Sequence, residues 1–221
     1  MKTKPTADRA YLRKKADGEA GWDGKESAYD KRKSHVERFF GRLYVPTRGR
    51  LLELGCGAGN MSFWLAVKGY ECHGVDITPA AIAWAQEKNT VSPVKVSFSV
   101  GDVTDLALFA DAFFDVVLDG HCLHWLGGED RRQALSSVRR VLRPEGFFLV
   151  CSQCGEPKAM EKWKHEGIIW DPVRRVAINK AGVVAAYFGT AESIVTEVET
   201  AGFRVVNWEV VTDTEGDEVF V

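Results

Sequence analysis

A glycine cluster in the stretch LLELGCGAGN, residues 51–60, constrains the fold of this chain more than any other feature. It follows a short apolar run that is typical of a buried strand, and it precedes MSFWLA, residues 61–66, which is typical of a helix. Glycine permits the positive φ values that a sharp turn from strand to helix needs. Its missing side chain also lets a ligand approach the N–H groups that a helix start leaves unpaired. The cluster therefore predicts a cofactor-binding loop.

The spacing of the glycines does not fit a cradle for a dinucleotide pyrophosphate. That fingerprint needs a third glycine three positions after the second, where this chain has Asn60. The glycines instead follow G-x-G-x-G, at Gly55, Gly57 and Gly59. Glu53, two residues before the first glycine, would repel a pyrophosphate and favour an ammonium or sulfonium group. A nicotinamide-dependent dehydrogenase is therefore the disfavoured alternative.

Length, charge and cysteine content limit the classes of protein to which this chain can belong. The 221 residues, 45% of them hydrophobic, suffice for one buried core. A net charge of -2 provides no cationic field for nucleic acid or anionic lipid. No apolar run approaches the roughly 20 residues of a membrane span, and no signal-peptide core is present, so we expect a cytoplasmic protein without a membrane segment. The five cysteines are odd in number and irregularly spaced, which favours free thiols. No feature of the sequence indicates an oligomeric state.

Strand and helix patterns alternate along the chain in βα units. This alternation predicts an α/β fold with a doubly wound, mostly parallel seven-stranded sheet, helices on both faces and a closing antiparallel hairpin. Thr78 and Pro79 are expected to begin one helix, and Thr190 and Gly202 to bound another. The expected strands are residues 50–54, 70–77, 94–100, 113–120, 147–152, 203–211 and 217–221.

We expect one folded domain in residues 22–221, preceded by a flexible tail in residues 1–21. The tail is rich in charge and poor in apolar residues, which is the composition of solvated segments. Residues 22–46 have an amphipathic pattern and are expected to form a helical cap. Residues 153–189 show no clean period and are expected to form a lid or insertion.

Three aspartates follow successive expected strands: Asp76, Asp102 and Asp119. Each one alone is also consistent with a helix cap or a turn. The carboxyl ends of parallel strands meet at one edge of the sheet, where ligands bind in open α/β folds. Asp76 is placed to accept hydrogen bonds from both hydroxyls of a ribose, and Asp102 to reach an adenine amino group. Together the three carboxylates predict a nucleoside site.

Five motifs in series, LLELGCGAGN, GVDITPAAI, GDVTDL, FDVVLDGHCLHWL and VLRPEGFFLV, resemble those of the class I S-adenosylmethionine-dependent methyltransferases. The resemblance covers roughly residues 51–152, with the closing helix and hairpin. It implies S-adenosyl-L-methionine as cofactor. It also implies that Glu53, Gly55 and Gly57 surround the methionine portion and that Asp76 holds the ribose. Asp102 and Val103 would hold the adenine, Asp119 and Gly120 would lie beside the methionine end, and Ile77 belongs to the same set.

The methyl acceptor is expected to be a small molecule. Family members that methylate nucleic-acid amino groups carry an Asn/Asp-Pro-Pro-aromatic stretch after the fourth strand, where this chain has DGHC. His121 would then meet the acceptor as a general base, with a packing or hydrogen-bonding role as the alternative. His124 is expected to be structural, and Trp22 and Tyr29 are candidate substrate contacts. A cofactor-binding module without catalysis remains the second reading.

Cys151 and Cys154 form a C-x-x-C pair near the end of an expected strand. With Cys122 they would supply soft ligands for a metalloid acceptor, and a thiol-assisted metalloid methyltransferase is therefore a further alternative. A full ligand quartet is missing from the sequence. Buried thiols without a resident metal are the favoured interpretation.

Overall fold

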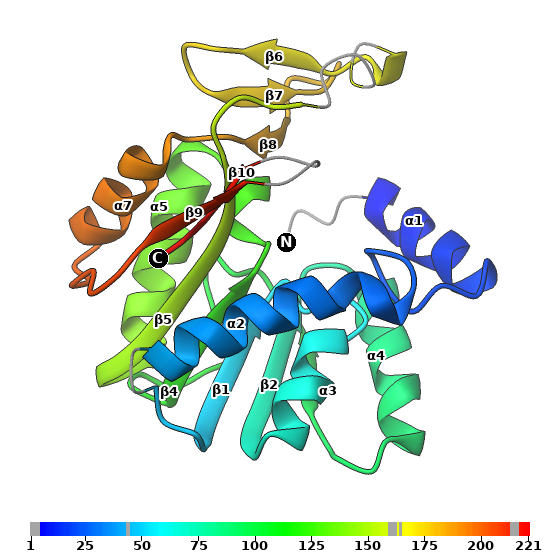
Figure 1. The fold of residues 1–221 in the computed structure, drawn as a ribbon. Coiled ribbons are helices and arrows are strands. Elements are labelled where there is room, and N and C mark those ends of the chain that lie inside the picture. Colours follow the sequence, from blue (N-terminus) through cyan, green and yellow to red (C-terminus); the bar gives the residue numbers. More distant parts are fainter. Residues whose placement is uncertain (1–4, 43–44, 159–162, 164, 213–216) are drawn as a thin grey trace.

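A seven-stranded sheet forms the centre of the protein in a computed structural model that describes residues 5–42, 45–158, 163, 165–212 and 217–221. The strand order is β3-β2-β1-β4-β5-β10-β9; β1 to β5 are parallel, and β10 runs antiparallel to both β5 and β9 (Figure 1). This confirms the predicted fold class and its closing hairpin. The strands are β1 (Gly49–Leu54), β2 (Tyr70–Asp76), β3 (Ser97–Val100), β4 (Phe114–Gly120), β5 (Leu142–Cys154), β9 (Glu209–Thr212) and β10 (Asp217–Phe220).

Helices cover both faces of the sheet because the buried strands are apolar on both sides. On β1, Leu52 and Leu54 pack against α5 and α7, whereas Leu51 packs in the core beneath α2, α3 and α4. All three leucines are fully buried. The helices are α1 (Pro5–Ala16), α2 (Asp30–Arg42), α3 (Asn60–Val67), α4 (Pro79–Val91), α5 (Gly128–Val141) and α7 (Ala191–Thr200), with short 3-10 turns η1 (Glu26–Tyr29) and η2 (Leu123–Trp125).

Residues 5–16 differ from the flexible tail that we predicted for residues 1–21. Residues 5–16 form α1, which packs beside α4. Tyr11 is buried, and an Asp8 carboxylate oxygen accepts a hydrogen bond from the Ala80 amide at 3.0 Å. The Thr78 side chain, predicted to cap α4, makes no capping hydrogen bond, and Asp8 satisfies one of the free amides at that helix start instead. A polar helix is stabilised here by contacts with a distant segment.

Residues 168–188, which we call the flap, form a small antiparallel sheet within the predicted insertion of residues 153–189. Its strands are β6 (Ile169–Asp171), β7 (Val176–Ile178) and β8 (Val184–Tyr187). Ala177, Ala186 and Phe188 form its own apolar cluster, against which Trp163 and Trp170 pack. Figure 1 shows the flap beyond the carboxyl ends of the central strands. The flap is thus placed on the side of the sheet where the predicted site lies.

The predicted ends of the helix between Thr190 and Gly202 are confirmed. The Thr190 hydroxyl oxygen accepts a hydrogen bond from the Ser193 amide at 3.1 Å, and Gly202 ends α7 with a φ of 90°. Helix α5 ends at Val141, and residues 143–146 form an irregularity within β5, where the register with β4 shifts. Residues 213–216, between the two strands of the closing hairpin, lie outside the described residues. Within the described ranges, every helix is too short or too polar to cross a lipid bilayer.

Docking of α1 through Asp8 can be tested by limited proteolysis. Loss of a helix cap costs about 0.5–2 kcal/mol, so Asp8→Ala should accelerate tryptic cleavage within α1 by about 2- to 30-fold. Asp17→Ala, which removes an exposed carboxylate just after the same helix, is the matched control and should cleave like the wild type. If wild type and Asp8→Ala were cleaved in α1 at equal rates, the docked helix would be contradicted.

Candidate functional site

The glycine loop joins β1 to α3 through three residues with left-handed backbone. Gly55, Gly57 and Gly59 have φ values of 62°, 53° and 79°. A Cβ atom at Gly55 would lie 2.7 Å from the Cβ of Cys122. The Gly57 amide donates to an Asp76 carboxylate oxygen at 3.0 Å, which ties the loop to the end of β2. Only glycine satisfies both the backbone and the space at these positions.

Glu53, at the end of β1, is buried beneath this loop. Its carboxylate accepts a hydrogen bond from the Ser62 hydroxyl of α3, and a Cβ atom at Gly120 would lie 2.9 Å from its Oε1. Burial raises the pKa of Glu53 to about 7, although the Ser62 hydrogen bond and the Arg32 guanidinium oppose the rise. An ammonium group beside this carboxylate would restore its charge.

Asp76 and Asp102 lie at the neighbouring ends of β2 and β3, as predicted. The Gly101 amide donates to the Asp76 carbonyl at 3.0 Å and holds the two strand ends together. Asp76 is 7% exposed, and burial raises the pKa of its carboxyl. One Asp102 oxygen accepts from the amide and the hydroxyl of Thr104 at 3.0 and 2.7 Å, so this carboxylate also shapes its own turn. Ile77 is half-buried beside Asp76, and Val103 is buried beside Asp102.

The N-terminal cap, residues 5–42, covers the glycine loop. A Cβ atom at Gly57 would lie 2.7 Å from the hydroxyl oxygen of Tyr11, which the sequence analysis did not identify as a site residue. The Trp22 ring lies 5.1 Å from the Tyr11 ring and 6.3 Å from Trp125, measured between centroids. Tyr29 is buried, and its hydroxyl accepts a hydrogen bond from the Asp23 amide at 3.2 Å. The predicted contacts Trp22 and Tyr29 thus lie in the cover of the site.

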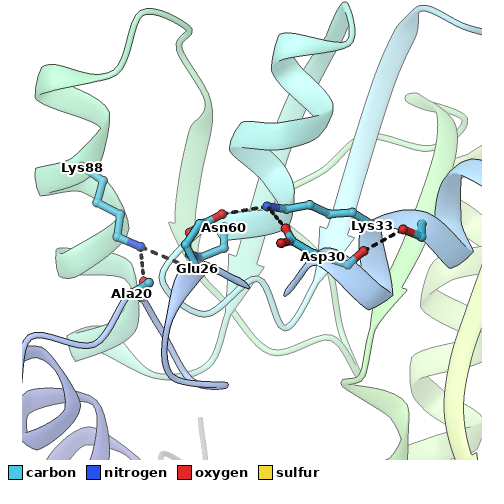
Figure 2. A network of polar contacts seen from close by, with 7 residues as sticks. Ala20, Glu26, Asp30, Lys33, Asn60 and Lys88 are labelled. Atoms are coloured by element: carbon cyan, nitrogen blue, oxygen red, sulfur yellow. Dashed lines mark hydrogen bonds and ion pairs between the residues drawn. The ribbon is translucent and has the colours of Figure 1, made fainter. Parts of the chain in front are cut away.

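A polar network fastens the cap to the glycine loop and to α4 (Figure 2). Lys88 of α4 donates to the Ala20 carbonyl at 2.5 Å and to the Asn60 side-chain oxygen at 3.1 Å. The Asn60 amide donates to Glu26 at 2.8 Å, and Glu26 also accepts from Lys33 at 2.8 Å. Burial lowers the pKa of Lys88 to about 8, and Glu26 opposes that change. Asn60, which occupies the position of the missing third glycine, therefore joins loop and cap.

The β4–α5 loop, residues 121–127, begins beside the glycine loop. One oxygen of Asp119, at the end of β4, accepts hydrogen bonds from the amides of Cys122 and Leu123 at 2.7 and 3.0 Å. Burial raises the pKa of Asp119 to about 6, against the effect of these bonds. The carboxylate therefore fixes the start of the loop. The next residue, Gly120, has no side chain, and Glu53 of the neighbouring strand packs beside it.

His121 opens this loop in a left-handed conformation, with a φ of 65°. Its Nε2 lies 3.7 Å from a Glu218 carboxylate oxygen of β10, and its ring centroid lies 5.6 Å from that of His124. Burial and the nearby Arg32 hold the pKa of His121 well below 6.5. Burial also lowers the pKa of His124, to about 3. His121 is therefore a neutral imidazole near pH 7.

The three cysteines considered for a metalloid do not converge. Cys151 packs in the core beneath α2, whereas Cys154 packs in the core beneath α5 and α7, because the residues lie on opposite faces of β5. Cys122 is half-buried against the second of these cores. In the described part of the chain, no three His, Cys, Asp or Glu side chains are grouped as metal ligands.

Part of the chain matches a known protein family. Residues 52–150 match a family model described as a methyltransferase domain. The putative methyltransferase YqeM of Bacillus subtilis is 33% identical over 133 residues, which cover 58% of this chain and 53% of YqeM. The chain thus spans about half the length of the curated relatives it matches first.

Solved structures share the fold over most of the chain. The PH0226 protein of Pyrococcus horikoshii superposes with a TM-score of 0.68 at 27% identity, covering 87% of this chain and 89% of that protein. The 1,6-didemethyltoxoflavin-N1-methyltransferase of Burkholderia thailandensis, solved with 1,6-didemethyltoxoflavin and S-adenosylhomocysteine, gives a TM-score of 0.62 at 20% identity. That match covers 100% of this chain and 89% of the other.

The doubly wound sheet and its glycine loop define a nucleoside-binding α/β domain. Residues 52–150 thus carry the methyltransferase domain of that family model, and a solved structure with the same fold, from Methanosarcina mazei, is described as a SAM-dependent methyltransferase. S-adenosyl-L-methionine is the cofactor of this family.

The raised pKa of Glu53 predicts how stability depends on pH in the absence of ligand. A carboxyl whose pKa rises on folding stabilises the protein below its unfolded value, near 4.5, and this stability is lost as pH rises through about 7. Glu53→Gln should therefore be more stable than wild type at pH 8 by up to roughly 3 kcal/mol, and not at pH 4.

Urea denaturation of both proteins at pH 4 and pH 8 measures this difference. Glu199→Gln, which changes an exposed carboxylate on α7, is the control and should show no such difference. Equal stability of wild type and Glu53→Gln at both pH values would show that burial does not destabilise the Glu53 carboxylate.

Proposed function

We propose that this domain transfers the methyl group of S-adenosylmethionine to a nucleophilic atom of a small molecule. The observation that carries the proposal is the position of the β4–α5 loop. A Cβ atom at Gly55 would lie 3.0 Å from the Cys122 sulfur, so the residue after His121 lies against the glycine loop. The loop that carries His121 and the glycine loop thus meet at one edge of the sheet.

The described residues fit the cofactor. Gly55 and Gly57 hold the loop in a left-handed backbone, with Cys122 and the Tyr11 hydroxyl packed where side chains would begin, and Glu53 is a buried carboxylate suited to an ammonium group. In the proposal Glu53, Gly55 and Gly57 bind the methionine portion and Asp76, with Ile77 beside it, binds the ribose. Asp102 and Val103 bind the adenine. Gly120 leaves room next to Glu53, and Asp119 acts through the amides of the β4–α5 loop.

When bound, S-adenosylmethionine supplies an electrophilic methyl group on a sulfonium. The chain itself contributes alignment of the acceptor and exclusion of water, which suffice for much of an in-line displacement. Tyr11, Trp22 and Trp125 cover the site from one side, and the flap lies beyond the strand ends on the other. His121 is neutral, so its ring nitrogen can accept a proton from an acceptor that must lose one.

Two observations support a small acceptor: the aromatic side chains that cover the site, and one solved structure with the same fold. The structure from Burkholderia thailandensis, a methyltransferase of a small heterocycle by its name, aligns with the whole of this chain. The net charge of -2 gives no support for a nucleic-acid acceptor. The second candidate function is a non-catalytic S-adenosylmethionine-binding module. We do not propose a thiol-assisted metalloid methyltransferase, because Cys151 and Cys154 lie on opposite faces of β5.

Release of S-adenosylhomocysteine tests the proposal. A screen of small amines, thiols, hydroxyl compounds and metalloids should give turnover with at least one class of acceptor. Turnover only with nucleic acid or protein would contradict the small-molecule proposal. Binding of S-adenosylmethionine without turnover on any acceptor would favour the non-catalytic module.

Asp76→Asn should weaken S-adenosylmethionine binding by about 1.5–3 kcal/mol, or roughly 10- to 150-fold, because charge-assisted hydrogen bonds to the ribose are lost. Titration calorimetry on the folded variant measures the effect. Asp111→Asn, which changes an exposed carboxylate that pairs with Arg140 before β4, is the control. Unchanged affinity of Asp76→Asn would remove Asp76 from the cofactor site.

His121→Ala should lower kcat by about 100-fold or more if His121 is the base, while S-adenosylmethionine affinity stays within about tenfold. A base acts in its neutral form, so the rate rises with pH through its pKa. Because burial and cationic neighbours lower this pKa, the wild-type rate should show no His121 step above pH 6.5.

The pH profile of kcat with an acceptor from the screen checks this expectation. The groups that bear on His121 are Lys31, Arg32 and His35 of α2, His124 of its own loop and Glu218 of β10. An unchanged rate in His121→Ala would leave His121 a packing residue.

A further inference from the structure

Arg131, in the first turn of α5, is an arginine that is only 1% exposed. A buried guanidinium is costly unless hydrogen bonds and charges compensate it. Its Nη1 donates to the Leu123 carbonyl at 2.6 Å, and its Nε donates to a Glu197 carboxylate oxygen of α7 at 2.5 Å. The centre of the guanidinium lies 4.7 Å from the centroid of the Tyr187 ring in the flap. One side chain thus contacts the β4–α5 loop, a core helix and the flap.

Leu123 is held from both sides. Its amide donates to Asp119, and its carbonyl accepts from Arg131. The left-handed backbone of His121, two residues earlier, costs of order 1–3 kcal/mol and persists only where its surroundings impose it. Asp119 and Arg131 are side chains that hydrogen-bond the backbone directly after it. Arg131 can therefore act on the position of the imidazole through Leu123, without touching the ring.

The flap reaches the body of the protein at the same place. A Cβ atom at Gly127, at the end of the loop, would lie 3.1 Å from a methyl carbon of Val184 in β8. Tyr187, the last residue of β8, lies over Arg131. The flap has its own apolar cluster, so a movement of the flap as a unit would keep that cluster and would withdraw the Tyr187 ring from the guanidinium.

We propose that Arg131 is a positioning residue that couples the flap to the β4–α5 loop, so that the loop holds His121 in place only when the flap is seated. The loop is the acceptor side of the site only if the proposed function is correct. The coupling itself is a property of the fold, and it is tested without turnover.

Cys122 reports on the loop. It is half-buried, whereas the other four cysteines are buried, so its reaction with Ellman's reagent measures how often the loop opens. Arg131→Met and Tyr187→Ala should each accelerate labelling of Cys122 by about tenfold, with the site assigned by peptide mass. The double variant should react no faster than the faster single variant, which is a coupling of about 1.4 kcal/mol.

Arg140→Met is the matched control. Arg140, on the same helix as Arg131, also donates to two carbonyls, of Phe109 and Leu106, and pairs with the Asp111 carboxylate, but none of these belongs to the β4–α5 loop or to the flap. Cys122 should be labelled in this control variant at the wild-type rate. Arg131→Lys replaces Arg131→Met in the cycle if the latter does not fold, and it should accelerate labelling because a lysine lacks the forked donors.

Two results would overturn the proposal. One is a double variant in which Cys122 is labelled about 100-fold faster than in wild type. The effects of the two substitutions would then multiply, and flap and loop would be independent. The other is an unchanged rate in Tyr187→Ala. Calorimetry with S-adenosylmethionine separates this test from the proposed function, because the variants should retain cofactor affinity within about threefold if that function holds.

Discussion

The hydrogen bond from the Gly57 amide to the Asp76 carboxylate is the contact on which the rest of the site depends. It exists because three glycines adopt left-handed backbone after β1 and carry the chain back toward the end of β2. The same turn leaves no side chain between the loop and Cys122, so the β4–α5 loop can pack against it. One local backbone constraint thus brings the ends of β1, β2 and β4 together.

Buried charges organise what surrounds this loop. Glu53 and Asp119 end neighbouring strands but serve different faces of the sheet: Glu53 meets Ser62 of α3, and Asp119 meets the amides that open the β4–α5 loop. Two cations also join segments that are far apart in sequence. The half-buried Lys88 binds Asn60 of the glycine loop, and the buried Arg131 binds Glu197 of α7. The site is therefore held by polar contacts whose partners are far apart in sequence. Such contacts fix geometry more than they add stability.

Sequence reasoning reached the sheet, its hairpin and the acids at the strand ends, because periodicity and strand-end positions are local signals. It missed α1, whose polar composition suggests a solvated tail, because the contacts that stabilise it lie on α4, some 70 residues away. The insertion that contains the flap was expected, but its three strands escaped prediction because they are short and carry no clean alternation. The divergence of Cys151 and Cys154 followed from their odd spacing on one strand, a signal that was present in the sequence. The buried environment of His121 has no local signature, since its neighbours come from α2 and β10.

Hydrogen exchange with and without S-adenosylmethionine tests the central claim, that the cofactor binds across the carboxyl ends of β1, β2 and β3, most directly. The account predicts slower exchange in peptides covering residues 53–62, 74–80 and 101–105, and no change in peptides covering β9 and the amino end of β5. Unchanged exchange in the glycine loop at saturating cofactor, or equal slowing throughout the sheet, would contradict it.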